Sequence, residues 1–198
     1  MERRADRIAG VIAGVLRQAL ADSRAGRIVL LADGSPESGL LAAMLEPRLG
    51  SSFAVQEVGG AGPQALLEGW ARVAGAQPDS LVAVATNKTA ALLGGALPGP
   101  LLPFGDLWAS QVQTLCGGWS GPPEVHELAE RAGGVDALDG ALALLVDRRR
   151  LPHEATAALP ADVGGTLLAL WERARFARRR LGLVPKLGTR TIGVDLFD

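Results

Sequence analysis

The sequence contains no tyrosine, one cysteine and two histidines among 198 residues. The absence of tyrosine excludes phenol chemistry from any mechanism. The single Cys116 cannot form a disulfide within the chain, which fits a reducing, cytoplasmic environment. Neither His126 nor His153 has a second histidine or a cysteine at the spacing of a metal site, so we predict surface or loop roles for both.

Strong net charge and long apolar runs are also missing. The formal net charge is -1, which argues against bulk electrostatic capture of nucleic acid or of an anionic membrane. No apolar run reaches the roughly 18 residues that a membrane-spanning helix needs. The basic and apolar start of the chain resembles an export signal, but Ile8, Val11, Ile12 and Val15 recur at helical spacing. We therefore predict an amphipathic helix there instead.

The sequence does contain enough apolar residues for a sizeable core. Hydrophobic residues make up 48% and charged residues 21%, ordinary globular values that exclude a wholly disordered chain. A chain of this length buries roughly 70% of its surface on folding. We find no internal repeat and no linker, and therefore predict a single domain over residues 1–198.

Short apolar runs alternate with helical patterns along the first half of the chain. The expected strands are residues 27–32, 53–58 and 81–86, with a brief one at 101–102; the expected helices are residues 36–49, 64–76, 89–93, 107–115, 135–147, 153–159 and 161–181. Such alternation is typical of parallel β-α units. We predict an α/β fold: an open parallel sheet of four or five strands with helices on both faces, and a helical C-terminal third.

The loop after the first expected strand is a candidate site, because ligands bind beyond the carboxyl ends of parallel strands. The free N–H groups of the next helix suit a phosphate. The same residues have a structural interpretation, since Ser35 is a good N-cap and Pro36 suits the first helical position. Asp33 and Glu37 oppose a phosphate, because a carboxylate about 4 Å from a phosphate charge costs about 4 kcal/mol. A divalent cation reverses that sign.

Three segments resemble a known family. After the first strand, Gly34 and Ser38 match the Ser-Gly-Gly-x-Asp-Ser pyrophosphate loop, or PP-loop, of N-type ATP pyrophosphatases. In residues 82–94, Asn87 and Lys88 match the Gly-Thr-x-Asn-Lys-Ser-Glu segment of NAD synthetases. The third segment, LLPFGDLWASQVQTL, is similar to their Leu-Leu-Pro-x-Gly-Asp-Leu-x-Lys-x-Gln-Val pattern. The resemblance to the NAD synthetase family covers nearly the whole chain, in order.

This resemblance implies an adenine nucleotide alpha hydrolase-like fold and a homodimer. It also implies a ligase reaction, in which ATP and magnesium serve to adenylate deamido-NAD and ammonia then displaces AMP to give NAD. The length leaves no room for a glutaminase domain, so the ammonia-dependent form is expected. The resemblance assigns ATP to Asp33, Gly34, Ser35, Glu37, Ser38, Thr86, Asn87 and Lys88, with Glu37 as the metal ligand.

The chain departs from the family at residues that carry the chemistry. Ala90 stands where the family has a magnesium-binding Glu, and Ala109 stands where it has a Lys. Loss of one such group costs roughly 3 kcal/mol, or about a hundredfold in rate. We therefore predict an NAD synthetase-like pseudoenzyme, with its activity weakened or lost. The alternatives are an active ammonia-dependent synthetase with a rearranged site, and a non-enzymatic interaction module whose basic C-terminal helix binds an anion through Arg178 and Arg179.

Overall fold

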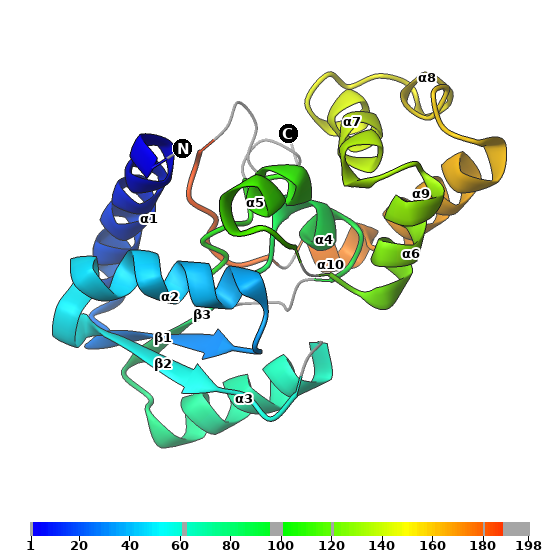
Figure 1. Cartoon of the computed structure of the whole chain (residues 1–198). Coiled ribbons are helices and arrows are strands. Elements are labelled where there is room, and N and C mark those ends of the chain that lie inside the picture. The colour runs from blue at the N-terminus through cyan, green and yellow to red at the C-terminus, as the bar shows by residue number, and fades with distance from the viewer. Residues whose placement is uncertain (1, 61–62, 96–100, 120, 180, 188–198) are drawn as a thin grey trace.

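A three-stranded parallel sheet forms the centre of the N-terminal half. The computed structural model describes residues 2–60, 63–95, 101–119, 121–179 and 181–187 (Figure 1). Strands β1 (Arg27–Ala32), β2 (Phe53–Glu57) and β3 (Ser80–Val84) lie in the order β2-β1-β3. Leu101 adds a parallel bridge to Ala83 beside β3. The predicted open parallel α/β architecture is confirmed, with three strands and this bridge in the described part where four or five strands were expected.

Helices cover both faces of the sheet (Figure 1). Helices α1 (Glu2–Ser23) and α2 (Pro36–Leu49) pack on one face, and α3 (Pro63–Ala76) packs on the other. A single 3-10 turn, η1 (Gly50–Ser52), joins α2 to β2.

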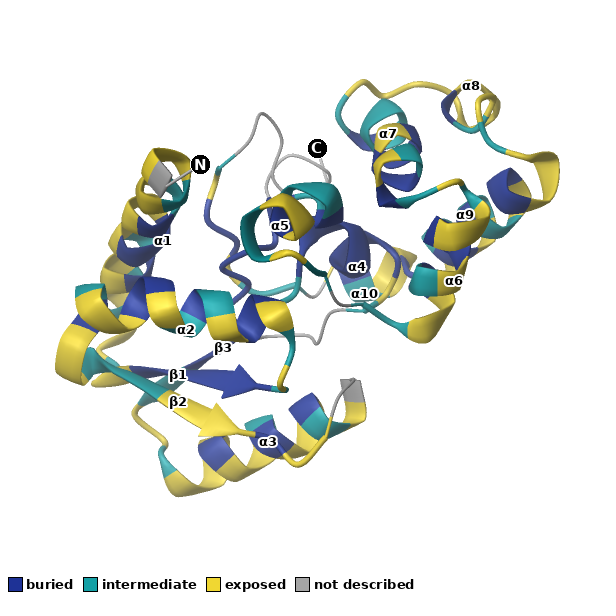
Figure 2. Cartoon of the chain, viewed as in Figure 1, coloured by how far each residue is buried: buried dark blue, intermediate teal, exposed yellow. Residues whose placement is uncertain are grey.

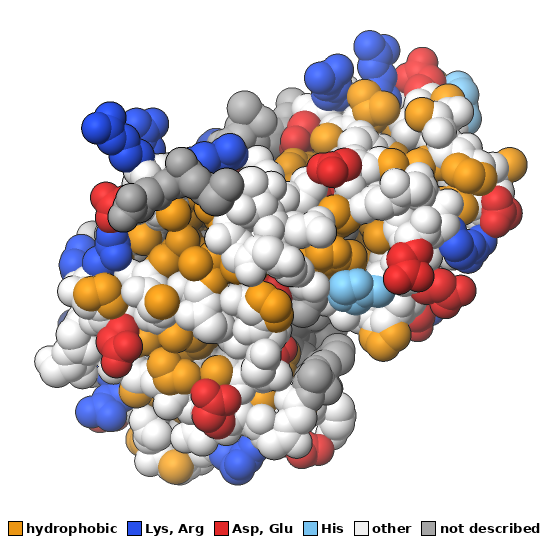
Figure 3. Space-filling view, viewed as in Figure 1, with side chains coloured by type: hydrophobic (Ala, Val, Ile, Leu, Met, Phe, Trp, Pro, Cys, Tyr) orange, Lys and Arg blue, Asp and Glu red, His pale blue; other side chains and the backbone are white. Residues whose placement is uncertain are grey.

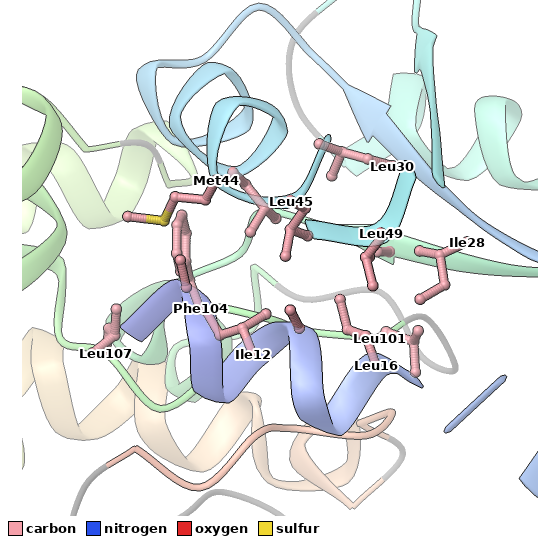
Figure 4. Packing of buried hydrophobic residues seen from close by; sticks show 14 of the residues in the cluster. Ile12, Leu16, Ile28, Leu30, Met44, Leu45, Leu49, Leu101, Phe104 and Leu107 are labelled. Carbon is pink, nitrogen blue, oxygen red and sulfur yellow. The ribbon is translucent and has the colours of Figure 1, made fainter. Parts of the chain in front are cut away.

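Strand β1 is buried from both sides, as its continuous apolar run predicts. Ile28 and Leu30 point toward α1 and α2, whereas Val29 and Leu31 point toward α3. This alternation follows from the two-residue period of a strand. Figure 4 shows Ile28 and Leu30 in the same cluster as side chains of α1 and α2. Strand β2 lies at the sheet edge and is largely exposed (Figure 2).

The rest of the chain is mainly helical. It contains α4 (Lys88–Leu92), α5 (Ala109–Cys116), α6 (Pro123–Arg131), α7 (Val135–Val146), α8 (Pro152–Ala155), α9 (Ala161–Arg173) and α10 (Arg175–Arg178). Two outcomes differ from the sequence-based expectation. Helix α6 lies where no helix was predicted, and the last expected helix is broken at Ala174 into α9 and α10. None of the described helices is long and apolar enough to cross a bilayer.

The close approach of α3 to the sheet gives a first testable prediction. A Cβ atom added at Gly69 would lie 2.5 Å from Cγ1 of the buried Val58. We expect Gly69→Ala to lower the free energy of unfolding by about 1–3 kcal/mol, because the added methyl overpacks this contact. The matched control is Gly14→Ala in α1, which meets no atom within 4 Å. It should instead raise the free energy of unfolding by about 0.5–1 kcal/mol. Urea unfolding measures both, and the same sign for the two variants would contradict the packing.

Candidate functional site

The loop between β1 and α2 uses its own polar groups to start the helix. Gly34 has a φ of 77°, in the left-handed region that favours glycine. The Ser35 N–H donates to Asp33 Oδ1 at 3.1 Å, and the Ser38 N–H donates to Ser35 Oγ at 3.2 Å. The Ser38 hydroxyl donates to the Ser35 carbonyl at 2.9 Å. The predicted N-cap role of Ser35 is confirmed, and the hydroxyl groups of this loop already have partners within it.

Glu37 and Asn87 join the two segments that the sequence assigned to ATP. The side chain of Glu37 is fully buried, and Asn87 Nδ2 donates to its Oε1 at 3.2 Å. Asn87 also caps α4, because its Oδ1 accepts from the Ala90 N–H at 2.9 Å. Thr86, next to Asn87 and two residues after the end of β3, is half-buried. The structure therefore brings the loop after β1 and the loop after β3 together, but through contacts inside the protein.

Lys88 lies in a buried ion cluster, which we call the Lys88 cluster and which consists of Lys88, Asp106, Trp108 and Asp147. The Lys88 side chain is 2% exposed, and its Nζ lies 3.1 Å from Asp147 Oδ1 and 3.9 Å from Asp106 Oδ1. The same Nζ lies 4.4 Å from the centre of the Trp108 ring. A buried ammonium is tolerated only when it is paired, and here carboxylates and an aromatic face provide that pairing.

A second polar network lies directly beside this cluster. The Thr89 hydroxyl donates to Asp139 Oδ1 at 2.5 Å and accepts from the Ala109 N–H at 3.0 Å. Asp139 Oδ2 accepts from the Ser110 N–H at 2.8 Å. The first N–H groups of α5, which have no partner within a helix, are thus bound by Thr89 and by a carboxylate from α7. Burial raises the pKa of Asp139, and the hydrogen bonds from Thr89 and Ser110 only partly oppose this shift.

Three of the acidic residues in these networks were not among the predicted site residues. Asp106 matches the family pattern in the third segment of the resemblance, but no role was predicted for it. Asp139 occupies the same helical stripe as Val135, Leu138 and Leu142, and a charged residue within an apolar stripe is a signal of burial. Asp147 comes directly after α7 and has no such signal.

The residues around Glu37 and Lys88 do not fit magnesium and a triphosphate in this arrangement. Glu37, the predicted metal ligand, is fully buried and bonded to Asn87. Lys88 is the cation of a cluster that also holds two carboxylates. Within the described ranges, no group of three or more His, Cys, Asp or Glu is arranged to hold a metal ion. In this arrangement the charged and hydrogen-bonding side chains pair with one another inside the protein.

The predicted anion site at Arg178 and Arg179 is divided between the interior and the surface. Arg178 is 6% exposed, its guanidinium stacks 3.6 Å from the centre of the Trp171 ring, and its Nη1 donates to the Leu92 carbonyl at 3.1 Å. A further bond goes to the Trp171 carbonyl. Burial lowers the pKa of Arg178 to about 10. Arg179 is exposed, so it alone of the pair faces solvent.

Comparison with known proteins shows which solved structures have a similar architecture. No family model and no curated protein matches the chain. Among solved structures it is similar to the NH3-dependent NAD synthetase from Campylobacter jejuni subsp. jejuni NCTC 11168 in complex with the nitrate ion, at 14% identity and a TM-score of 0.56. That match covers 87% of this chain and 95% of the other. The chain has an NAD synthetase-like fold.

The chain also shows a weaker similarity to part of a second, larger protein. This is the glutamine-dependent NAD+ synthetase from Acinetobacter baumannii in complex with ADP, at 14% identity and a TM-score of 0.40. The match covers 95% of this chain and 48% of the other chain. At these identities the likeness concerns the fold, so the chemistry of this chain has to be argued from its own residues.

The buried Asp139 gives a prediction about pH. Its folded pKa lies above the ordinary value of 3.8, so the folded protein binds this proton more tightly than the unfolded chain does. Its contribution to stability is therefore greatest below 3.8 and falls as pH rises through the raised pKa. We expect the unfolding free energy of the wild type to fall relative to that of Asp139→Asn across this window.

The measurement is urea unfolding over a pH series that begins near the ordinary pKa of 3.8. The control is Asp79→Asn, the same change at an exposed position in the turn before β3, which should follow the wild type at every pH. Parallel curves for the wild type and Asp139→Asn would contradict the role of burial.

Proposed function

We propose that this chain is an NAD synthetase-like protein whose nucleotide site has become a structural network, so that ATP-dependent amidation of deamido-NAD is weakened or lost. The observation that carries the proposal is the burial of Lys88, 2% exposed, against Asp147 and Asp106. The resemblance assigns this lysine to ATP. Here its charge is already balanced within the protein.

The chemistry of adenylation explains why that matters. Adenylate formation brings several negative oxygens together, and cations have to stabilise the charge that develops. The positions where the family has a metal-binding Glu and a Lys are Ala90 and Ala109, which are 2% and 0% exposed. A charged side chain at either position would have to be buried in this packing.

The homodimer and the cytoplasmic location expected above are parts of this proposal. The homodimer is supported by the family resemblance alone. The location is supported by the single cysteine, which fits a reducing environment.

The proposal predicts little or no affinity for ATP with magnesium. The reason is that Glu37 and the Lys88 cluster present carboxylates where phosphates would bind. Calorimetric titration with ATP and magnesium tests this, and micromolar affinity would contradict it.

An assay with deamido-NAD, ATP and ammonia should show turnover at least about a hundredfold below that of an active synthetase. The Campylobacter jejuni enzyme, run in parallel, is the control for the assay. Normal turnover would establish the alternative of an active, rearranged synthetase.

The structural role of Lys88 can be measured separately from any activity. Lys88→Met leaves buried carboxylates without their cation, and we expect the free energy of unfolding to fall by about 3–5 kcal/mol. The control is Arg72→Met, which removes a positive charge at an exposed position on α3. This variant should change the free energy of unfolding by no more than about 0.5 kcal/mol. Equal, small effects for both variants would show that the Lys88 cluster does not support the fold.

A further inference from the structure

A cleft of about 340 Å³ opens at the edge of the sheet where β1 and β3 begin. The segment from the end of α3 to the start of β3 forms one wall, and the residues at the start of β1 form the other. Figure 1 shows α3 ending at the side of the sheet where β1 begins. The loops that carry Glu37 and Asn87 follow the carboxyl ends of the strands, so the cleft lies at the opposite edge of the sheet from their contact.

The side chains of Arg27 and Ser80 lie on the face of the sheet that α3 covers. The two residues are register partners in neighbouring parallel strands, and Arg27 shares its face with Val29, which packs in the cluster beneath α3. Helix α3 ends over this face, and the Gln77 N–H continues its last turn by donating to the Val73 carbonyl at 2.7 Å. Arg27, Ser80 and Gln77 therefore line the same cleft.

The polar side chains of the cleft have unused bonding capacity. Gln77 Oε1 is screened from solvent and accepts no hydrogen bond from any described residue. Arg27 and Asp79 are exposed, and neither forms an ion pair with a described residue, although both line the cleft. The last carbonyls of α3 add partial negative charge, because the C-terminus of a helix leaves carbonyls without a partner. The cleft thus offers one cation, Arg27, and a larger set of acceptors.

We propose that this cleft binds the zwitterionic head group of a small aliphatic α-amino acid. Arg27 binds the carboxylate, because a guanidinium matches the two oxygens of a carboxylate. Asp79 and Gln77 Oε1 bind the ammonium, and the Gln77 amide turns toward the cleft as it gains this donor. Ala76 and Pro78 form the uncharged part of the wall, against which the aliphatic side chain packs.

The charges around the cleft favour a zwitterion over a ligand of one sign. In Figure 3 the largest groups of Lys and Arg side chains lie over the start of α1 and over the turn between α7 and α8, away from the end of α3. A simple anion would be repelled by Asp79 and by the carbonyls of α3, and a simple amine would be repelled by Arg27. A zwitterion pairs with both signs of charge at once.

The size of the cleft limits the ligand to a small molecule. Its volume of about 340 Å³ is near the lower end of the range of about 300–1,000 Å³ that ligand sites span. A single amino acid suits this space better than a nucleotide or a peptide does. The inference is independent of the proposed function, because neither Glu37 nor any residue of the Lys88 cluster takes part in it.

An NMR titration of the full chain with L-valine tests the proposal, with the backbone amides of Gly26 and Ser80 and the side-chain amide of Gln77 as reporters. We expect saturable shifts at these groups. Isovalerate, which lacks the ammonium, and isobutylamine, which lacks the carboxylate, should each bind at least about tenfold more weakly. No saturable shift with L-valine, or equal binding of either analogue, would overturn the proposal.

The binding must also depend on the two charged side chains. Arg27→Gln and Asp79→Asn change exposed positions, and each should weaken L-valine binding by at least about tenfold. Arg27→Lys keeps the charge without the paired donors and should fall between Arg27→Gln and the wild type. Arg72→Gln on α3 and Asp136→Asn on α7 are the matched controls at exposed positions and should bind as the wild type does. Unchanged binding in Arg27→Gln or Asp79→Asn, or an equal loss in the controls, would show that the named groups do not hold the ligand.

Discussion

The buried ammonium of Lys88 is the constraint on which the arrangement of the C-terminal half depends. An unpaired charge in the interior is too costly to persist, so the segments that carry its partners have to converge on it. Asp106 and Asp147 come from positions 18 and 59 residues further along the chain. Asp106 also accepts from the Leu187 N–H at 2.6 Å, which holds the last described segment against the same cluster.

The first turn of α4 connects several parts of the molecule through neighbouring residues. Asn87 reaches Glu37 at the start of α2, Lys88 reaches Asp147 after α7, and Thr89 reaches Asp139 within α7. Asn87, the N-cap of α4, thus points toward α2, whereas Lys88 and Thr89 in the first turn both reach the α7 segment. The Asn-Lys-Thr sequence that resembles a nucleotide-binding segment therefore acts in this structure as a junction between the sheet and the helices beyond it.

Sequence patterns predicted the elements whose burial is periodic and missed those decided by tertiary contacts. Strand β1 was predicted with its observed bounds, because an apolar run buried on both faces has few alternatives. Helix α6 was missed although Val125, Leu128 and Ala129 follow helical spacing after Pro122. The segments after β1 and β3 meet through Glu37 and Asn87, since parallel strands end at one edge, and their assignment to an ATP site stays a prediction. The burial of Asp106, by contrast, depends on how distant segments of the chain pack around it. The local sequence pattern carries no information on that packing.

The polar contacts of α7 have a structural role besides stability, which is to orient this helix. A buried ion pair contributes little more than well-packed apolar side chains would, so the Lys88 cluster is a poor way to gain stability. The cluster does, however, fix the orientation of α7 relative to α4. Asp139 and Asp147 are eight residues apart, a little over two helical turns, so both carboxylates leave α7 on the side of α4. An apolar contact tolerates a shift of register, whereas these two carboxyl groups need particular partners: Lys88 for Asp147, and Thr89 and Ser110 for Asp139. Helix α7 is thus held against α4 and α5 by polar contacts that fix its orientation as well as its place.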